Sequence, residues 1–189
     1  MCLPLCEVRI ALHQPYLLPY RGWFDLIASV DKFVLGDDYQ WIKGGWINRN
    51  NFPEPFTFRL AKHSSSAKIN ELYFFNLKED VRDFKRKFPK LNSDKYLSLM
   101  QPSYNLSFNI YLVTKEICKD LGIVTPIYFS SQIPHGKFVG GVLDIVRALG
   151  GDTYVNAPGG RALYNQEMFG DIKLEFIEAE PSPSILCGL

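Results

Sequence analysis

The first 38 residues alternate between apolar runs and turn-forming residues in an order that strongly constrains the fold. Residues 7–12 (EVRIAL) alternate polar and apolar side chains and then become wholly apolar, which is typical of a strand entering a sheet. Pro15 and Pro19 exclude regular helix until about Tyr20. Apolar side chains then recur at helical spacing over residues 21–30, and residues 33–35 form a second apolar run. The order strand, loop, helix, strand predicts a βαβ unit with parallel strands and a right-handed crossover.

The same alternation continues along the rest of the chain. The elements expected there are, in order, a loop at 39–55, paired strands at 56–60 and 69–75, helices at 79–91 and 106–121, a strand at 123–130, a helix at 136–149, a strand at 153–155, a tight turn at 158–160 and a strand at 172–177. Strands that alternate with helices predict an α/β fold, in which a mostly parallel, Rossmann-like sheet is covered by helices on both faces. No repeat or change of composition marks a boundary, so we expect a single domain over residues 1–189.

Charge and cysteine usage argue against several classes of protein. The formal net charge is only +1, so nucleic acid is not expected as a partner, and the small-molecule substrate expected instead rests on the motifs described below. The four cysteines show no C-x-x-C spacing and the three histidines are scattered, so no metal site is expected, and the pattern identifies no cofactor. Residues 1–12 lack a signal-peptide pattern, and no stretch approaches the roughly 20 apolar residues of a membrane span. These features predict a cytoplasmic protein with reduced thiols and no membrane insertion, and they leave the oligomeric state open.

A local cluster of Lys and Arg residues lies between Arg82 and Lys95. Val81, Phe84 and Phe88 recur within it at helical spacing, so we interpret the charges as the solvated face of a helix, with a phosphate-binding patch as the less frequent alternative. On a second predicted helix, Cys118 has no base beside it and is interpreted as a packing residue.

Three segments follow predicted strands at their carboxyl ends, and they cover residues 13–20, 37–51 and 156–164. In open parallel sheets, ligands bind beyond the carboxyl ends of the strands, where the strand order reverses. Parallel strands would therefore gather all three segments on one rim of the sheet.

His13 and the pair Asp37-Asp38 stand at the beginning of two of these segments. An imidazole titrates near neutrality, so His13 is a candidate general acid or base, or else a histidine that pins the turn. The two carboxylates are candidates for holding a sugar hydroxyl, an amine or a metal ion, or else for capping a turn.

The segment after Asp38 is rich in tryptophan, amides and cations, a mixture suited to stacking and hydrogen-bonding a polar ring. The candidate binding residues here are Gln40, Trp41, Lys43, Trp46, Asn48, Arg49 and Asn50. The third segment contains Gly159-Gly160, which can offer backbone N–H groups to an anion or form a simple turn.

The order of these motifs resembles the WbqC-like family. The residues that carry the resemblance are HQPYLLPY at 13–20, GWFD at 22–25, DDYQ at 37–40, WINRN at 46–50, LGGDTY at 149–154, Gly159-Gly160 and Tyr164. The run Ser184-Ile185-Leu186 is similar to a further segment of that family, with Cys187 where the family has Asp. The resemblance adds Gln14, Tyr16 and Tyr164 to the candidate binding residues.

The resemblance implies a role in O-antigen or related small-molecule biosynthesis, by acyl or aminoacyl transfer to an amino sugar or a nucleotide-linked sugar. In this hypothesis His13 deprotonates the acceptor and Asp37 and Asp38 hold it. A nucleotidylyl-transferase-like site is an alternative, although Tyr16 stands where those enzymes have a second histidine. A non-catalytic module that binds a sugar or a partner protein is the third hypothesis.

Overall fold

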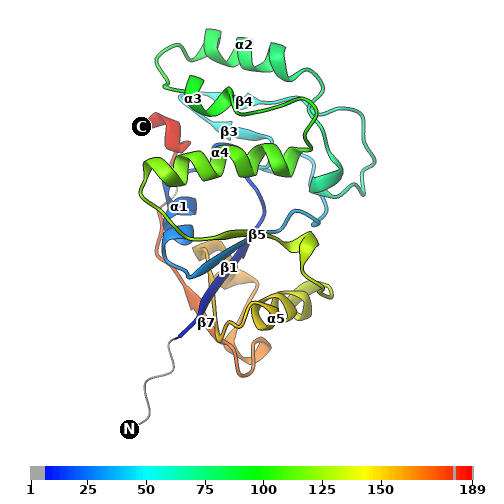
Figure 1. The fold of residues 1–189 in the computed structure, drawn as a ribbon, viewed down its shortest axis with the longest axis vertical. Helices are drawn as coiled ribbons and strands as arrows, with labels where there is room; N and C mark the ends of the chain where they lie inside the picture. Colours follow the sequence, from blue (N-terminus) through cyan, green and yellow to red (C-terminus); the bar gives the residue numbers. More distant parts are fainter. Residues whose placement is uncertain (1–6, 181, 189) are drawn as a thin grey trace. The chain divides into compact units, whose positions relative to one another are not determined.

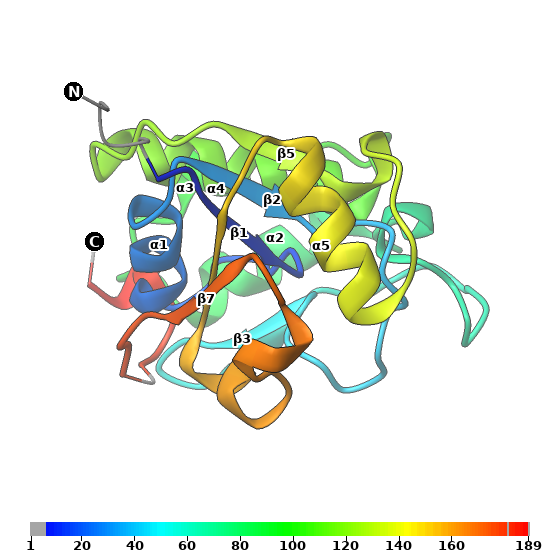
Figure 2. The same ribbon diagram turned by 90° about the horizontal axis from the view of Figure 1, so that it is seen from below.

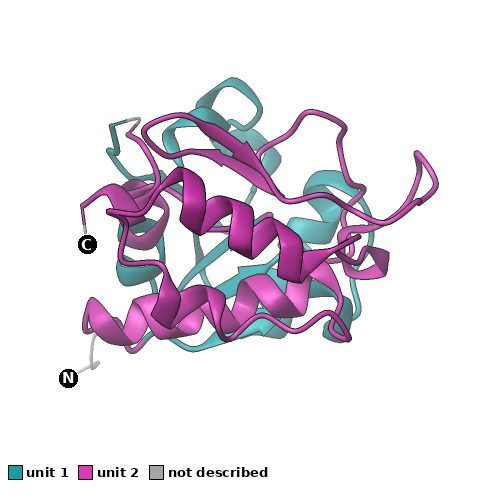
Figure 3. Ribbon diagram, turned by 90° about the horizontal axis from the view of Figure 1, so that it is seen from above, with its two compact units in different colours: residues 1–13, 25–36, 125–180 teal, residues 14–24, 37–124, 181–189 magenta. Residues whose placement is uncertain are grey.

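The computed structural model describes residues 7–180 and 182–188, and it divides them into two compact units (Figures 1 and 3). Unit 1 contains the described residues of 1–13, together with 25–36 and 125–180. Unit 2 contains 14–24, 37–124 and the described residues of the C-terminal segment. The number of domains stays a prediction.

Unit 1 is built on a five-stranded sheet of order β5-β2-β1-β6-β7, of which β1, β5 and β7 are labelled in Figure 1. Its strands are β1 (Arg9–His13), β2 (Lys32–Leu35), β5 (Ile127–Phe129), β6 (Thr153–Asn156) and β7 (Lys173–Phe176). Every neighbouring pair in this sheet is parallel. The predicted α/β fold with a parallel sheet is therefore confirmed.

Helices α1 (Arg21–Ala28) and α5 (Phe138–Ala148) connect these strands and lie on opposite sides of them (Figure 2). The connection β1-α1-β2 runs toward β5, whereas β5-α5-β6 runs back across the sheet. Because both crossovers are right-handed by the usual rule, opposite directions put the two helices on opposite faces. The strand order reverses between β1 and β6, which makes this pair the switch point of the sheet.

The centre of the sheet is completely buried. Ile10 and Ala11 of β1 and Phe33 of β2 have no exposed surface. Gly151, which precedes β6, lies against this layer, since a Cβ placed there would come within 2.4 Å of the Ile10 Cγ1 atom. Glycine at this position therefore allows the backbone to approach the core closely.

The described part of unit 2 includes a small hairpin and several helices. The hairpin consists of the antiparallel strands β3 (Arg49–Asn51) and β4 (Pro55–Thr57), and the helices are α2 (Leu77–Lys87), α3 (Asp94–Leu97) and α4 (Leu106–Asp120). Its core is aromatic: the Phe84 ring, which is fully buried, lies 4.6–5.7 Å from the rings of Phe52, Phe56, Phe58 and Phe88.

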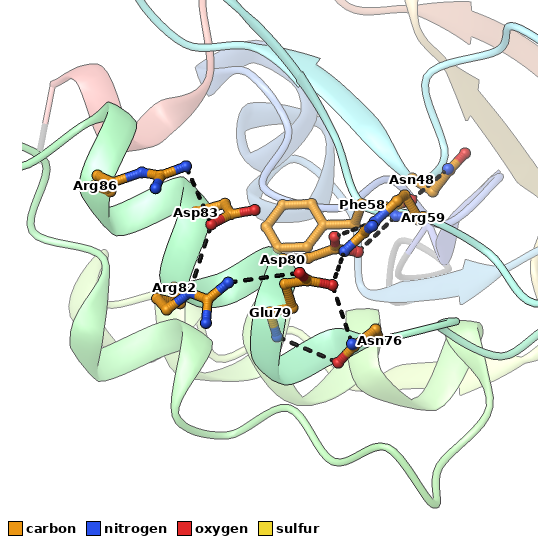
Figure 4. A network of polar contacts seen from close by, with 9 residues as sticks. All are labelled: Asn48, Phe58, Arg59, Asn76, Glu79, Asp80, Arg82, Asp83 and Arg86. Atoms are coloured by element: carbon orange, nitrogen blue, oxygen red, sulfur yellow. Dashed lines mark hydrogen bonds and ion pairs between the residues drawn. The ribbon is translucent and has the colours of Figure 1, made fainter.

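Helix α2 carries most of the basic cluster on its solvated face, as predicted. Asn76 caps the helix by accepting a hydrogen bond from the Glu79 backbone N–H. Arg82 and Arg86 are exposed and pair with Glu79 and Asp83 (Figure 4). These cations are therefore balanced by neighbouring carboxylates rather than gathered into an anion site.

Cys118 is buried on α4, so its interpretation as a packing residue is confirmed, and burial raises the pKa of its thiol to about 11. The interpretations that involve Cys2 and Cys6 fall outside the described residues.

The structure differs from the sequence prediction in short elements. Residues 39–55 were expected to be entirely irregular, but they include β3, and residues 69–75 begin with a 3₁₀ turn at Ile69–Glu71 instead of a strand. The expected strand pair is reduced to one bridge between Leu60 and Phe74. Helix α3 was not expected, and the predicted turn at 158–160 is a 3₁₀ helix at Pro158–Ala162. Local propensity is a weak guide to such short elements, because packing decides them.

Candidate functional site

His13 is the last residue of β1 and lies at the carboxyl edge of the unit 1 sheet. Its backbone pairs with Leu35 of β2, and its carbonyl accepts a hydrogen bond from the Gly36 N–H at 2.8 Å. The side chain is partly exposed. The sequence placed this histidine just beyond a strand end, and the structure places it at the strand end itself.

The neighbouring strand β6 ends at Asn156, which is buried and was not among the predicted site residues. Its side-chain Oδ1 accepts a hydrogen bond from the Ala157 N–H at 2.8 Å. A Cβ at Gly160 would lie 2.3 Å from the Asn156 Nδ2 atom, so this position accommodates only glycine without a shift. Gly159 is exposed and has open space beside it.

Tyr164 is packed beside this turn. Its backbone N–H donates to the Gly160 carbonyl at 3.0 Å, and its ring lies edge-on to Tyr154 and Phe169. Burial raises the pKa of the Tyr164 hydroxyl, so the ring is neutral at physiological pH. The aromatic contacts indicate that Tyr164 supports the turn.

Strands β1 and β6 are adjacent, with Arg9 opposite Thr153 and Ile10 opposite Tyr154. Their carboxyl ends carry His13 and the Asn156–Gly160 turn, on the two sides of the switch point. This is the edge at which parallel α/β sheets bind ligands. Within unit 1, the structure thus places His13, the first residue of one predicted segment, and the turn of another at the same edge of the sheet.

Unit 2 begins with the loop that follows His13, and a set of hydrogen bonds holds this loop in place. Leu18 is fully buried and has a positive φ of 52°, a conformation that is strained for a leucine. Its carbonyl accepts hydrogen bonds from the Asn50 Nδ2 at 2.6 Å and from the Ser184 Oγ at 2.7 Å. Asn50 was expected to bind substrate, but its side-chain Nδ2 donates to the Leu18 carbonyl instead.

Ser184 was missed as a site residue, although the resemblance of its segment to the family was a usable signal. Its N–H also donates to the Asn51 carbonyl at 2.8 Å, and Ile185 donates to the Pro19 carbonyl. The C-terminal segment therefore braces the loop. Gln14 and Tyr16 are half-buried in this loop. The pKa of the Tyr16 hydroxyl is raised, mainly by burial and to a smaller extent by the nearby Tyr20.

Asp37 is buried and joins the segment 37–41 to the segment 67–70. Its side-chain Oδ2 accepts from the Asn70 Nδ2 at 3.2 Å, and its carbonyl accepts from the Asn70 N–H at 2.8 Å. Asp38 is half-buried. Gln40 forms a bridge with Lys68, and its Nε2 donates to the Ser65 carbonyl at 3.1 Å.

The backbone N–H of Trp41 donates to the Ala67 carbonyl at 2.9 Å, which continues the pairing of segments 37–41 and 67–70. Its ring lies edge-on to His63, with 4.7 Å between the ring centres. The indole Nε1 atom is buried and has no hydrogen-bond partner in the described chain. Lys43 is exposed and precedes Gly44, whose φ of +78° turns the chain.

The remaining predicted binding residues are Asn48, Trp46 and Arg49, and they have two different roles. The Asn48 side chain is buried and donates to the Phe58 carbonyl at 2.7 Å, while the Phe58 N–H donates to the Asn48 carbonyl (Figure 4). Asn48 is thus used to fix the hairpin. Trp46 is 44% exposed, and the Arg49 Cζ atom lies 4.7 Å from the centre of its ring.

In residues 7–180 and 182–188, no three His, Cys, Asp or Glu side chains are grouped as a metal site would need. Nor does this part of the chain contain a helix whose length and apolar character would let it traverse a lipid bilayer.

The fold and the carboxyl edge define an α/β protein with a parallel sheet and a candidate ligand site at its switch point. The chain belongs to the WbqC-like protein family, whose model matches residues 14–184. It is also similar to a protein of Mycobacterium tuberculosis described as "Uncharacterized protein Rv1507c", with 50% identity over 42 residues. That match spans 22% of this chain and 18% of the relative, far less than two thirds of its length. No solved structure matches the chain.

Proposed function

We propose that this protein is a transferase of surface-polysaccharide or related small-molecule biosynthesis, acting in the cytoplasm. It transfers an acyl or aminoacyl group to the amine of an amino sugar or a nucleotide-linked sugar. The observation that supports the proposal most directly is the position of His13 at the carboxyl end of β1, beside the switch point. Membership of the WbqC-like family supports the biosynthetic setting.

In the transfer step, the acceptor amine attacks the carbonyl carbon of the donor, so that a C–N bond forms and the bond to the leaving group breaks. The neutral His13 imidazole takes the proton that the amine loses and returns it to the leaving group. The N–H groups of the Gly159-Gly160 turn bind the negative charge of the donor or of the activated sugar.

The roles that we assign to unit 2 residues follow from their chemistry. Asp37 and Asp38 hold the acceptor amine, and Gln14, Tyr16 and Gln40 hydrogen-bond its hydroxyl groups. Trp41 and Trp46 stack on the rings of the ligand, while Lys43 and Arg49 bind its anionic part. Asn48 and Asn50 contribute indirectly, since they hold the hairpin and the loop.

The proposal is tested by incubating the full chain with nucleotide sugars, amino-sugar nucleotides and acyl or aminoacyl donors, first by thermal shift and then by turnover. A ligand at a hundred times its Kd adds about 2.7 kcal/mol of stability, which a thermal shift detects. With a productive pair of substrates, His13→Ala is expected to lower the rate by about 10²–10⁴ while the ligand still binds.

His135→Ala is the matched control, because His135 is another half-buried histidine of unit 1 that the proposal does not use. A His13→Ala variant that keeps the wild-type rate would refute the catalytic role. Binding of a sugar without turnover for any donor would favour a non-catalytic binding module instead.

A further inference from the structure

Trp46 and Arg49 form a cation–π contact in unit 2. Arg49 begins β3, and its backbone is paired with Thr57 of β4, so the hairpin fixes the point from which its side chain extends. The Arg49 guanidinium lies over the Trp46 ring, whose side chain remains 44% exposed. A positioned guanidinium thus lies beside an indole that a ligand can reach.

One donor of Arg49 has no acceptor in the part of the chain that the structure describes. Its Nε atom is buried and has no hydrogen-bond partner among the described residues, and the same holds for the Nε1 atom of Trp41. Buried N–H donors in native proteins are almost always paired, and an unpaired one needs a specific explanation. A ligand that supplies an acceptor atom explains the unpaired Nε–H of Arg49.

The charge of Arg49 shows the same pattern among the described residues. Within the described chain no carboxylate pairs with Arg49, nor with Lys43, which is exposed three residues before Trp46. Arg59 of the same unit shows the usual arrangement, since Asp80 and Glu79 bind its guanidinium at 2.6 and 2.7 Å (Figure 4). Arg49 and Lys43 therefore offer two positive charges to a ligand.

These features fit a phosphoryl group that is attached to a ring. A phosphate monoester carries nearly two negative charges, which match the two cations. A guanidinium binds such a group through N–H donors in its own plane while its face stays against an indole. The exposed part of Trp46 can stack on the adjoining ring.

We infer that Trp46, Arg49 and Lys43 form a binding site for a phosphoryl group next to a flat ring, as in a nucleoside diphosphate. The inference deepens the proposed function and rests on it in so far as the ligand is the nucleotide-linked part of an activated sugar.

The experiment titrates the ¹⁵N-labelled full chain with inorganic phosphate, a nucleoside diphosphate, a sugar 1-phosphate and the free sugar. Indole N–H signals report Trp23, Trp41 and Trp46 separately, and loss of a signal in Arg49→Gln identifies the Arg49 Nε–H. The nucleoside diphosphate is expected to shift the Arg49 and Trp46 signals. The Trp23 signal should stay in place, because that side chain is buried.

Arg49→Gln is expected to weaken nucleoside diphosphate binding by about tenfold or more, as the loss of a charge-assisted hydrogen bond would. Arg82→Gln is the matched control, because Arg82 is an exposed arginine of unit 2 with carboxylate partners. This variant should bind the nucleoside diphosphate with the affinity of the wild type. Trp46→Ala should weaken the nucleoside diphosphate more than inorganic phosphate. Far-ultraviolet circular dichroism establishes that each variant is folded.

The inference is overturned if no phosphorylated probe at millimolar concentration shifts these signals, if folded Arg49→Gln binds as the wild type does, or if the free sugar binds as tightly as the sugar 1-phosphate. Its failure is distinguishable from that of the proposed function. Phosphoryl binding without any transfer would refute the transferase and leave this site intact. Transfer whose KM is unchanged in Arg49→Gln would refute this site and leave the transferase intact.

Discussion

The carbonyl of Leu18 offers a direct test of how the loop after His13 is held. It accepts one hydrogen bond from Asn50 and one from Ser184, and Leu18 itself has a positive φ. We expect Asn50→Ala and Ser184→Ala each to lower the free energy of unfolding by about 1 kcal/mol, the usual net value of one hydrogen bond. In each single variant the remaining donor still satisfies the carbonyl.

The double variant leaves this buried carbonyl without either side-chain donor, which costs about 1–3 kcal/mol of desolvation beyond the lost bonds. The left-handed conformation of Leu18 costs about 1–2 kcal/mol, and in the double variant neither side-chain hydrogen bond stabilises it. We therefore expect the double variant to lose more than the sum of the singles, with a coupling of at least about 0.5 kcal/mol.

Urea unfolding followed by tryptophan fluorescence measures these free energies. Ser182→Ala is the matched control, because Ser182 is an exposed serine of the same C-terminal segment and should lose almost nothing. Strictly additive losses, or a double variant as stable as the wild type, would refute the reasoning.

Three further predictions concern packing and ionisation. Phe84→Ala removes a fully buried ring from the aromatic cluster and should lower the free energy of unfolding by about 3–5 kcal/mol, measured by urea unfolding; a loss under about 1 kcal/mol would contradict the packing. Gly160→Ala forces its Cβ against Asn156 and should lower the melting temperature, whereas Gly159→Ala, with open space beside it, should not. Since burial raises the pKa of Cys118 from 9.0 to about 11, the native thiol stays protonated while the unfolded one ionises. Stability should therefore fall between pH 9 and 11, less so in Cys118→Ala, and an identical slope in both proteins would exclude this cause.

Much of unit 1 was predictable because short stretches of sequence indicate its helices and strands. The apolar run at 7–12, the prolines after it and the helical spacing at 21–30 predicted β1, α1 and β2, and the structure confirms them. The rule that parallel α/β sheets bind ligands at carboxyl ends then singled out His13 and the turn at 159–160. These features depend on periodicity and on backbone restrictions that each residue carries with it.

The roles of the amide side chains could not be predicted in this way. Asn48 and Asn50 have the composition of a binding loop, yet their side chains donate to the Phe58 and Leu18 carbonyls. A buried carbonyl must find a donor wherever the chain supplies one, and that donor can be distant in sequence. Ser184, for example, reaches Leu18 across 166 residues.

The sequence by itself determined the class of fold, the positions of the main helices and strands, and the presence of a polar segment rich in tryptophan. Only the tertiary structure decided the strand order that puts the switch point between β1 and β6. It also decided which polar groups are used internally and which, like the Nε–H of Arg49, find no partner among the described residues. The physical reason is that periodicity is a local property, whereas the pairing of a buried polar group depends on what the fold brings beside it.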